Sequence, residues 1–127
     1  MKTIPTYTAT IYVGCRPGYS RDHTVEDDHR IADTMVVDMC RAYCERVKLC
    51  LTVERTTFVY VGGMEGGARV GLINYPRFPR TVHEVRFLAL DLAHKLMTEL
   101  GQERVSVVFP DETVMLEKDD PPSELMD

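Results

Sequence analysis

Residues 49–74 read LCLTVERTTFVYV, then GGMEGG, then ARVGLIN, three segments of different composition. The first and third are rich in β-branched and aromatic residues with an alternating pattern, which is typical of strands. Four glycines in the six residues between them supply the positive φ angles that a chain reversal requires. We therefore expect a strand over 49–61 with a bend or bulge at 54–56, a hairpin loop over 62–67 and a return strand over 68–74.

A strand and a helix are expected on each side of this hairpin. Before it, TYTATIYV over 6–13 alternates as a strand does, and 25–47 carries apolar residues at three- and four-residue spacing, as an amphipathic helix does. After it come a helix over 82–100, a strand over 105–109 and a short strand over 113–117. The caps agree with this reading: Thr24 with Asp27 and Thr81 with Glu84 form capping boxes, and Gly101 ends the second helix.

The order strand–helix–strand–strand–helix–strand, followed by a short hairpin strand, predicts an α+β fold of the ferredoxin-like type. One antiparallel sheet would carry both helices on one face. With 127 residues the chain suits a single domain, which we place over 1–117. The remaining 118–127 are acidic and rich in proline, and this composition favours a disordered tail.

Charge and hydropathy exclude several classes of function. Seven acids and one base lie between 111 and 127, whereas the other 110 residues hold fourteen bases and thirteen acids, so no basic stripe exists for nucleic acid. The chain has no apolar run long enough to span a membrane and no signal-peptide pattern at its start, which predicts a cytoplasmic protein. In that compartment the four cysteines stay reduced, and their spacing matches no metal motif. We expect no metal and no cofactor.

The loop over 75–80, YPRFPR, is the first candidate site. Its two prolines restrict the backbone beside a helix N-terminus, where free N–H groups and the macrodipole attract anions, and its arginines add paired donors. We expect a phosphate- or carboxylate-bearing ligand here, nucleotides included. In the alternative interpretation, the arginines pair with the acidic turn at Asp111 and Glu112, and the aromatic rings serve the core or a subunit contact. The site residues would be Asn74, Tyr75, Arg77, Arg80 and Thr81.

The loop after the first strand is a second candidate. Cys15 lies beside Arg16 and close to a helix N-terminus, a setting that lowers a thiol pKa, and His23 is the nearby base that a cysteine nucleophile needs. The alternative interpretation is a buried structural thiol, and it is the one we favour. The full set of candidates in this loop is Cys15, Arg16, Tyr19, Arg21 and His23.

The sheet face away from the helices offers a third possibility. It is expected to show a mixture of polar and apolar side chains, which suits a homodimer formed through this open face. Three functions follow in order of preference: a binder of a small anionic ligand, an assembly module without a ligand, and a cofactor-free enzyme of the dimeric ferredoxin-like type. The enzyme would have a cleft over the open face, with Tyr12, Tyr60 or His23 as the proton-transfer group.

Overall fold

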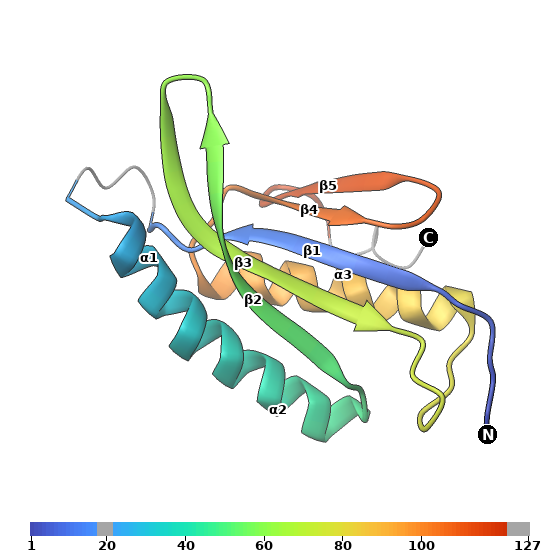
Figure 1. Cartoon of the computed structure of the whole chain (residues 1–127). Helices are drawn as coiled ribbons and strands as arrows, with labels where there is room; N and C mark the ends of the chain where they lie inside the picture. Colours follow the sequence, from blue (N-terminus) through green and yellow to red (C-terminus); the bar gives the residue numbers. More distant parts are fainter. Residues whose placement is uncertain (18–21, 122–127) are drawn as a thin grey trace.

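The structure, a computed structural model of the chain, describes residues 1–17 and 22–121. The α+β prediction is confirmed: a five-stranded antiparallel sheet carries two long helices (Figure 1). The elements in chain order are β1 (Thr8–Gly14), α1 (Val25–Ile31), η1 (Ala32–Val36), α2 (Val37–Val47), β2 (Leu51–Tyr60), β3 (Gly63–Ile73), α3 (Val82–Glu99), β4 (Arg104–Val108) and β5 (Thr113–Glu117).

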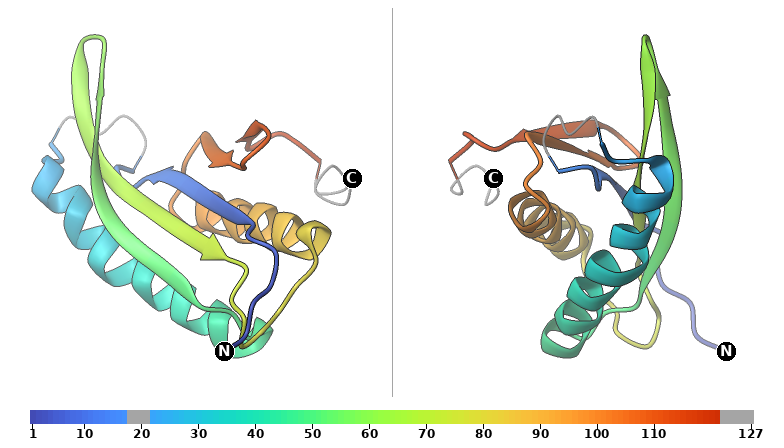
Figure 2. Two further views of the ribbon diagram at one scale, coloured as in Figure 1. Left: turned by 45° about the vertical axis from the view of Figure 1, so that its right-hand side comes forward. Right: turned by 90° about the vertical axis from the view of Figure 1, so that its left-hand side faces the viewer.

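The strands lie in the order β2-β3-β1-β4-β5, and every neighbouring pair is antiparallel. In the central strand β1, Ala9, Ile11 and Val13 are fully buried, whereas Thr10 and Tyr12 between them are only half-buried. Because side chains alternate across a strand, one face of the sheet meets the core and the other is open. Both helices pack on the core face (Figure 2).

The first helix runs without interruption through α1, η1 and α2, as predicted for 25–47. Its middle segment, η1, is π-helical. Both predicted capping boxes are present: Thr24 accepts from the Asp27 amide, and Thr81 accepts from the Glu84 amide. Lys48, with φ of 61°, ends the first helix in the left-handed conformation.

The hairpin between β2 and β3 corrects two predictions. Its loop is not 62–67 but only Val61 and Gly62, and Gly62 alone has a positive φ, of 87°. The pairing from Leu51 with Leu72 to Tyr60 with Gly63 is uninterrupted, so no bulge interrupts 54–56. Because a two-residue turn involves only these two positions, both strands continue up to it. Because β1 pairs with β3 only up to Gly67, the outer part of the hairpin extends beyond the sheet (Figure 1).

Close packing, not chain reversal, accounts for glycine at 66 and 67. A Cβ at Gly66 would lie 2.6 Å from the Asp28 Cβ and 2.9 Å from the Val25 carbonyl oxygen. A Cβ at Gly67 would lie 2.4 Å from the Val13 carbonyl oxygen and 2.5 Å from the Phe58 ring. The two glycines therefore let α1 approach one face of the hairpin and an aromatic ring lie against the other.

The chain after β5 begins with a turn. The Lys118 amide donates to the Glu103 carbonyl at 2.9 Å, and the Asp120 amide donates to the Glu117 carbonyl at 3.0 Å. Residues 122–127 lie outside the described part of the chain, so the acidic tail stays a prediction. Within 1–17 and 22–121, no helix is long and apolar enough to cross a membrane.

Candidate ligand site on the open sheet face

A hollow of about 440 Å³ lies on the open face of the sheet, where the hairpin leaves it. Strands β1 to β4 and the junction between α3 and β4 all contribute to it. Its wall holds three aromatic rings, two carboxylates, an amide and a guanidinium among the following residues: Tyr12, Gly14, Phe58, Tyr60, Glu65, Gly101, Gln102, Glu103, Arg104, Val105 and Ser106.

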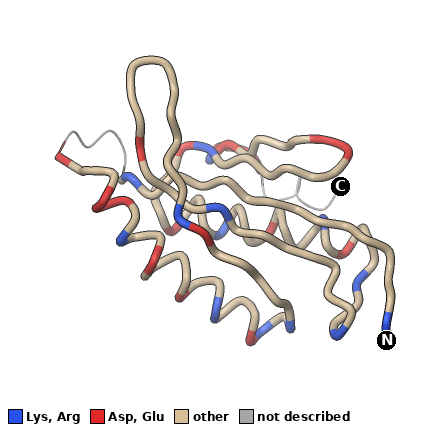
Figure 3. Tube along the Cα trace, viewed as in Figure 1, with Lys and Arg blue, Asp and Glu red and all other residues tan. Residues whose placement is uncertain are grey.

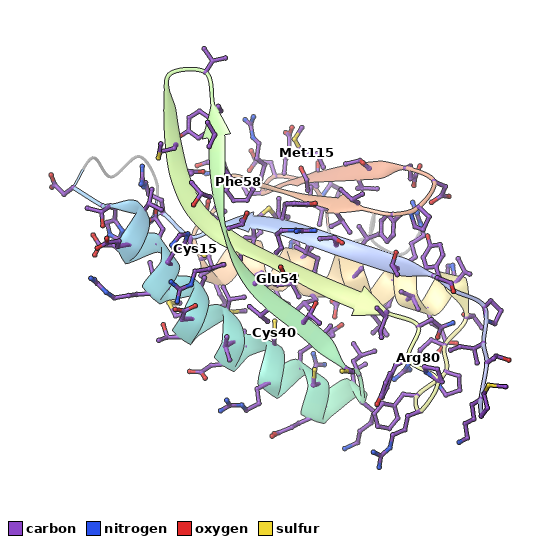
Figure 4. The ribbon with its side chains drawn as sticks, in the orientation of Figure 1. Cys15, Cys40, Glu54, Phe58, Arg80 and Met115 are labelled. Carbon is purple, nitrogen blue, oxygen red and sulfur yellow. The ribbon has the colours of Figure 1, made fainter. Side chains whose placement is uncertain are left out.

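The strand register explains why a hollow forms here. Gly14 lies opposite Gly67 across β1 and β3, so neither strand places a side chain on this part of the open face. The Phe58 ring from β2 leans over Gly67 and closes one side (Figure 4). The two glycines therefore let side chains of neighbouring elements lie directly against the sheet: the Phe58 ring over Gly67, and the Gln102 and Glu65 oxygens over Gly14.

Two oxygen acceptors converge above Gly14. A Cβ built on Gly14 would lie 2.8 Å from Gln102 Oε1 and 3.3 Å from Glu65 Oε1. The Gln102 amide nitrogen donates to the carbonyls of Arg16 at 2.7 Å and Leu100 at 3.1 Å, which holds the side chain in place. Glu65 and Gln102 thus form an acceptor pair that suits two donors of a ligand.

Burial is the main cause that raises the pKa of Glu65, and the negative charge of Asp28 raises it further. The Arg16 guanidinium acts in the opposite sense and lowers it. A half-buried carboxyl with a raised pKa in a concave site is a frequent property of functional acids.

A buried ion pair supports the hollow from below. Asp28 in α1 is fully buried, and its Oδ2 accepts from Arg16 Nε at 3.1 Å and from the Gly66 amide at 2.9 Å. Arg16 Nη2 lies 2.9 Å from the same oxygen. The Asp28 carboxylate therefore links the loop after β1 to the base of the hairpin. The Arg16 backbone carbonyl also accepts a hydrogen bond from the Gln102 side-chain amide.

The second predicted site is only partly assembled. Arg16 and His23 both face Asp28, with His23 Nδ1 3.5 Å from Asp28 Oδ1. Cys15 is buried, and this burial raises the pKa of its thiol to about 12, which suits the structural role and not a nucleophile. The other two candidates, Tyr19 and Arg21, lie outside the described residues.

The first predicted site is assembled, but its polar groups have partners within the chain. The Arg80 guanidinium donates to the carbonyls of Val47 and Lys48 at the end of α2, and its amide donates to Asn74 Oδ1 at 2.9 Å. The Thr81 amide donates to the Glu84 carboxylate, which already occupies the N-terminus of α3. An anion site there stays a prediction.

The aromatic rings and the second arginine of that loop lie close together. Tyr75 and Phe78 have ring centroids 6.0 Å apart, and the Arg77 guanidinium carbon is 5.8 Å from the Phe78 centroid. The acidic turn at Asp111 and Glu112 pairs with Arg86 of α3, and not with the loop arginines that the alternative interpretation named.

The sequence predicted some of the residues that line the hollow. Tyr12 and Tyr60 were predicted as proton-transfer groups of a cleft over the open face, and both line it. Phe58, Glu65 and Gln102 were missed. The alternation of β2 and β3 through a two-residue turn would have placed Phe58 and Glu65 on the open face, whereas nothing in the sequence brings Gln102 to them.

The comparisons with known proteins point to one fold. No protein-family model matches the chain, and no curated protein matches it in sequence. A phage SAM lyase in the apo state matches with a TM-score of 0.63 and 19% identity over 91% of each chain. A phage SAM lyase in complex with S-methyl-5'-thioadenosine matches with a TM-score of 0.56 and 18% identity, over 88% of this chain and 89% of that chain. The protein therefore shares its fold with these structures.

Proposed function

We propose that the protein binds a nucleoside of the S-adenosylmethionine class in the hollow on the open sheet face and cleaves it as a lyase. The observation that carries this proposal is the Glu65–Gln102 acceptor pair above Gly14, with aromatic rings in the wall of the same hollow. The shared fold with a SAM lyase, and with a SAM lyase holding S-methyl-5'-thioadenosine, supports the choice of ligand class.

The aromatic rings suit the adenine base. Phe58 leans over Gly67, and Tyr12 and Tyr60 border the same hollow, so a planar heterocycle has ring faces or edges to contact. Stacking of a base on an aromatic side chain contributes about 1–3 kcal/mol.

The acceptor pair suits the ribose. The neighbouring 2'- and 3'-hydroxyl groups of a ribose are two donors, and Glu65 and Gln102 present two acceptor oxygens close together. A hydrogen bond to a charged carboxylate contributes about 1.5–3 kcal/mol. This assignment places the sulfur of the ligand further along the open face.

The reaction needs little from the protein beyond orientation. A sulfonium is a good leaving group, because the electron pair of the broken carbon–sulfur bond stays on sulfur and neutralises its charge. Cleavage on the amino-acid side leaves S-methyl-5'-thioadenosine, and the carbon that loses sulfur forms a new bond to the carboxylate oxygen of the same amino acid, which closes a lactone and needs no added base. The protein contributes by holding the reacting conformation and limiting water in the hollow.

The test is calorimetric titration with S-methyl-5'-thioadenosine, together with chromatography of S-adenosylmethionine incubated with the protein. We expect binding, release of S-methyl-5'-thioadenosine, and roughly tenfold or greater weakening of binding in Glu65→Gln. Glu103→Gln is the matched control, because Glu103 also lines the hollow but its carboxylate pairs with Lys118 at 3.3 Å. Absence of binding to the wild-type protein contradicts the proposal, and equal losses in both variants contradict the acceptor pair.

The same experiment tests the ribose assignment. If Glu65 contacts ribose hydroxyls, Glu65→Gln weakens S-adenosylmethionine and S-methyl-5'-thioadenosine alike, since both contain the ribose. If its carboxylate instead faced the sulfonium, only the charged ligand would lose affinity, because the thioether carries no charge.

We also propose that the fold is ferredoxin-like. In the order β2-β3-β1-β4, strand β3 lies between the two strands of the first strand–helix–strand unit, and β1 lies between those of the second. Such interleaving supports the split arrangement predicted from the element order. The short β5 adds to the edge at β4.

Self-association through the open face is a further part of the proposal. The outer hairpin exposes large apolar side chains on Val59, Tyr60, Val61 and Met64, and the open face exposes Ile73, Val108 and Met115. A second copy of the chain would cover both surfaces. Sedimentation should show an oligomer that Ile73→Glu with Val108→Glu, both on the open face, dissociates, and a monomeric wild-type protein would contradict it.

A further inference from the structure

Arg69 stands at the centre of the open face, beside the hollow. It lies opposite Tyr12 of β1 on one side and opposite Glu54 of β2 on the other. Basic and acidic residues lie close together on this part of β2 and β3 (Figure 3). Because Tyr12 itself lines the hollow, Arg69 is one strand away from any ligand bound in it.

The guanidinium of Arg69 lacks the partners that such a group usually has. Its Nε is buried and donates no hydrogen bond, counting every described residue as a possible acceptor. The guanidinium carbon lies 5.4 Å from the centroid of the Tyr12 ring. A buried donor without an acceptor costs about 1–3 kcal/mol, so a change of the Arg69 rotamer that brings the guanidinium onto an anion recovers that cost.

The nearest acid along the register does not neutralise Arg69. Glu54 is directly opposite on β2, yet no ion pair within 4.0 Å joins the two side chains, and Glu54 is exposed (Figure 4). The adjacent base Arg55 points to the helix side, where it pairs with Asp33 at 2.5 Å. A cation and an anion thus stand side by side on the open face, each available to a ligand.

We propose that Arg69 binds the α-carboxylate of the amino-acid half of the nucleoside sulfonium, and so determines specificity for ligands that carry an amino acid. This inference rests on the proposed function and deepens it. With the ribose at Glu65 and Gln102, the 5' substituent extends along the open face past Tyr12 to Arg69. Glu54 then faces the α-ammonium of the same zwitterion.

The chemistry of the two end groups fits this assignment. A guanidinium presents a planar set of donors that matches a carboxylate, and the ring of Tyr12 below it holds the plane in place. S-methyl-5'-thioadenosine has no amino acid and makes no such contact. Arg69 should therefore separate substrate from product, since the product loses this interaction when the carbon–sulfur bond breaks.

The test compares two stable ligands by calorimetric titration: S-adenosylhomocysteine, which carries the amino acid, and S-methyl-5'-thioadenosine, which does not. We expect Arg69→Gln to weaken S-adenosylhomocysteine roughly tenfold or more, and to leave S-methyl-5'-thioadenosine within about twofold. The affinity of Arg69→Lys for S-adenosylhomocysteine should lie between those of the wild-type protein and Arg69→Gln, because lysine keeps the positive charge but lacks the paired donors of a guanidinium. Arg55→Gln, a cation of β2 on the other face, should change neither affinity.

Three results would overturn the inference. Equal changes for the two ligands in Arg69→Gln would show that Arg69 does not contact the amino acid. A selective loss in Arg104→Gln instead would assign the carboxylate to the exposed cation that lines the hollow. If the wild-type protein binds neither ligand, the proposed function fails as well, whereas binding without selectivity in Arg69→Gln removes only this inference.

Discussion

The two ends of the sheet differ in how completely their polar groups are paired. At the end with the loop over 75–80, the Arg80 guanidinium and the Thr81 amide have partners within the chain. At the hairpin end, His23 Nδ1 and Asp28 Oδ1 face each other at 3.5 Å without a hydrogen bond, and on the open face Arg69 Nε is buried with no hydrogen bond to any described residue.

This difference shows that a charged loop beside a helix N-terminus is not by itself a binding site. Arg80 acts as a cap for the carbonyls that end α2, and the Glu84 carboxylate fills the place an anion would take. Unsatisfied buried groups are costly, so they persist where function or a ligand compensates for them. The comparison supports the proposed ligand site at the hairpin end, and it indicates a structural role for the loop end.

Asp28→Ala should produce the largest effect and test the support under the hollow. The change removes the buried partner of Arg16 and leaves a guanidinium that is only 17% exposed without its counter-charge. Removing one member of a buried ion pair costs about 3–5 kcal/mol. The free energy of unfolding, measured with urea, should fall by that amount.

The matched control for Asp28→Ala is Asp33→Ala in the same helix. Asp33 pairs with Arg55, but both side chains are about half exposed, so the loss should stay below about 1 kcal/mol. Equal losses in the two variants would mean that the buried pair contributes no more than a surface pair.

Gly67→Ala should follow, because its Cβ would lie 2.4 Å from the Val13 carbonyl oxygen, which is backbone and cannot rotate away. We expect a loss of about 1–3 kcal/mol in thermal or urea unfolding. Gly71→Ala on the same strand is the control, since its Cβ meets only the Thr52 hydroxyl, which can turn. A larger loss at Gly71 than at Gly67 would contradict the close packing around Gly67.

Arg80→Ala tests the loop end and should have a smaller effect. The variant loses hydrogen bonds to the Val47 and Lys48 carbonyls, worth about 1 kcal/mol in the free energy of unfolding. Binding of S-methyl-5'-thioadenosine at the hollow should stay unchanged. Exposed Arg77→Ala should change neither quantity. Loss of nucleoside binding in Arg80→Ala would instead indicate that the ligand binds at the loop over 75–80.

The sequence predicted the α+β class and most helix and strand positions because local signals agreed with one another. The threonine caps at 24 and 81 set the helix starts, and the alternation of TYTATIYV set the faces of β1. The glycines of the hairpin were misread: only Gly62 makes the turn, whereas 66 and 67 are small for the sake of neighbours distant in sequence. Composition records that a residue is small, but it does not say which contact requires it.

The candidate site was predicted less well, for a related reason. Tyr12 and Tyr60 were named for the open face because strand alternation is a local property. Gln102 reaches Glu65 only because the junction between α3 and β4 lies beside the loop after β1, where it bonds the Arg16 carbonyl. Likewise, the commitment of Arg80 to the end of α2 depends on tertiary packing that the motif YPRFPR does not encode.

Glu65→Gln should have the smallest effect on stability. It is also the variant that best distinguishes a binding role at the hairpin end from a structural role. The folded pKa of Glu65 is raised, mainly by burial, so its ionised form is less favourable in the folded protein than in the unfolded chain. In the unfolded chain the carboxyl has a pKa of about 4.3. As the pH rises from there through the raised pKa of the folded protein, the free energy of unfolding decreases. Urea unfolding should therefore show the variant matching the wild-type protein near pH 4 and exceeding it slightly at pH 7. A group that costs stability and yet is needed for nucleoside binding is held for function; a variant less stable at pH 7 would assign Glu65 to structural support instead.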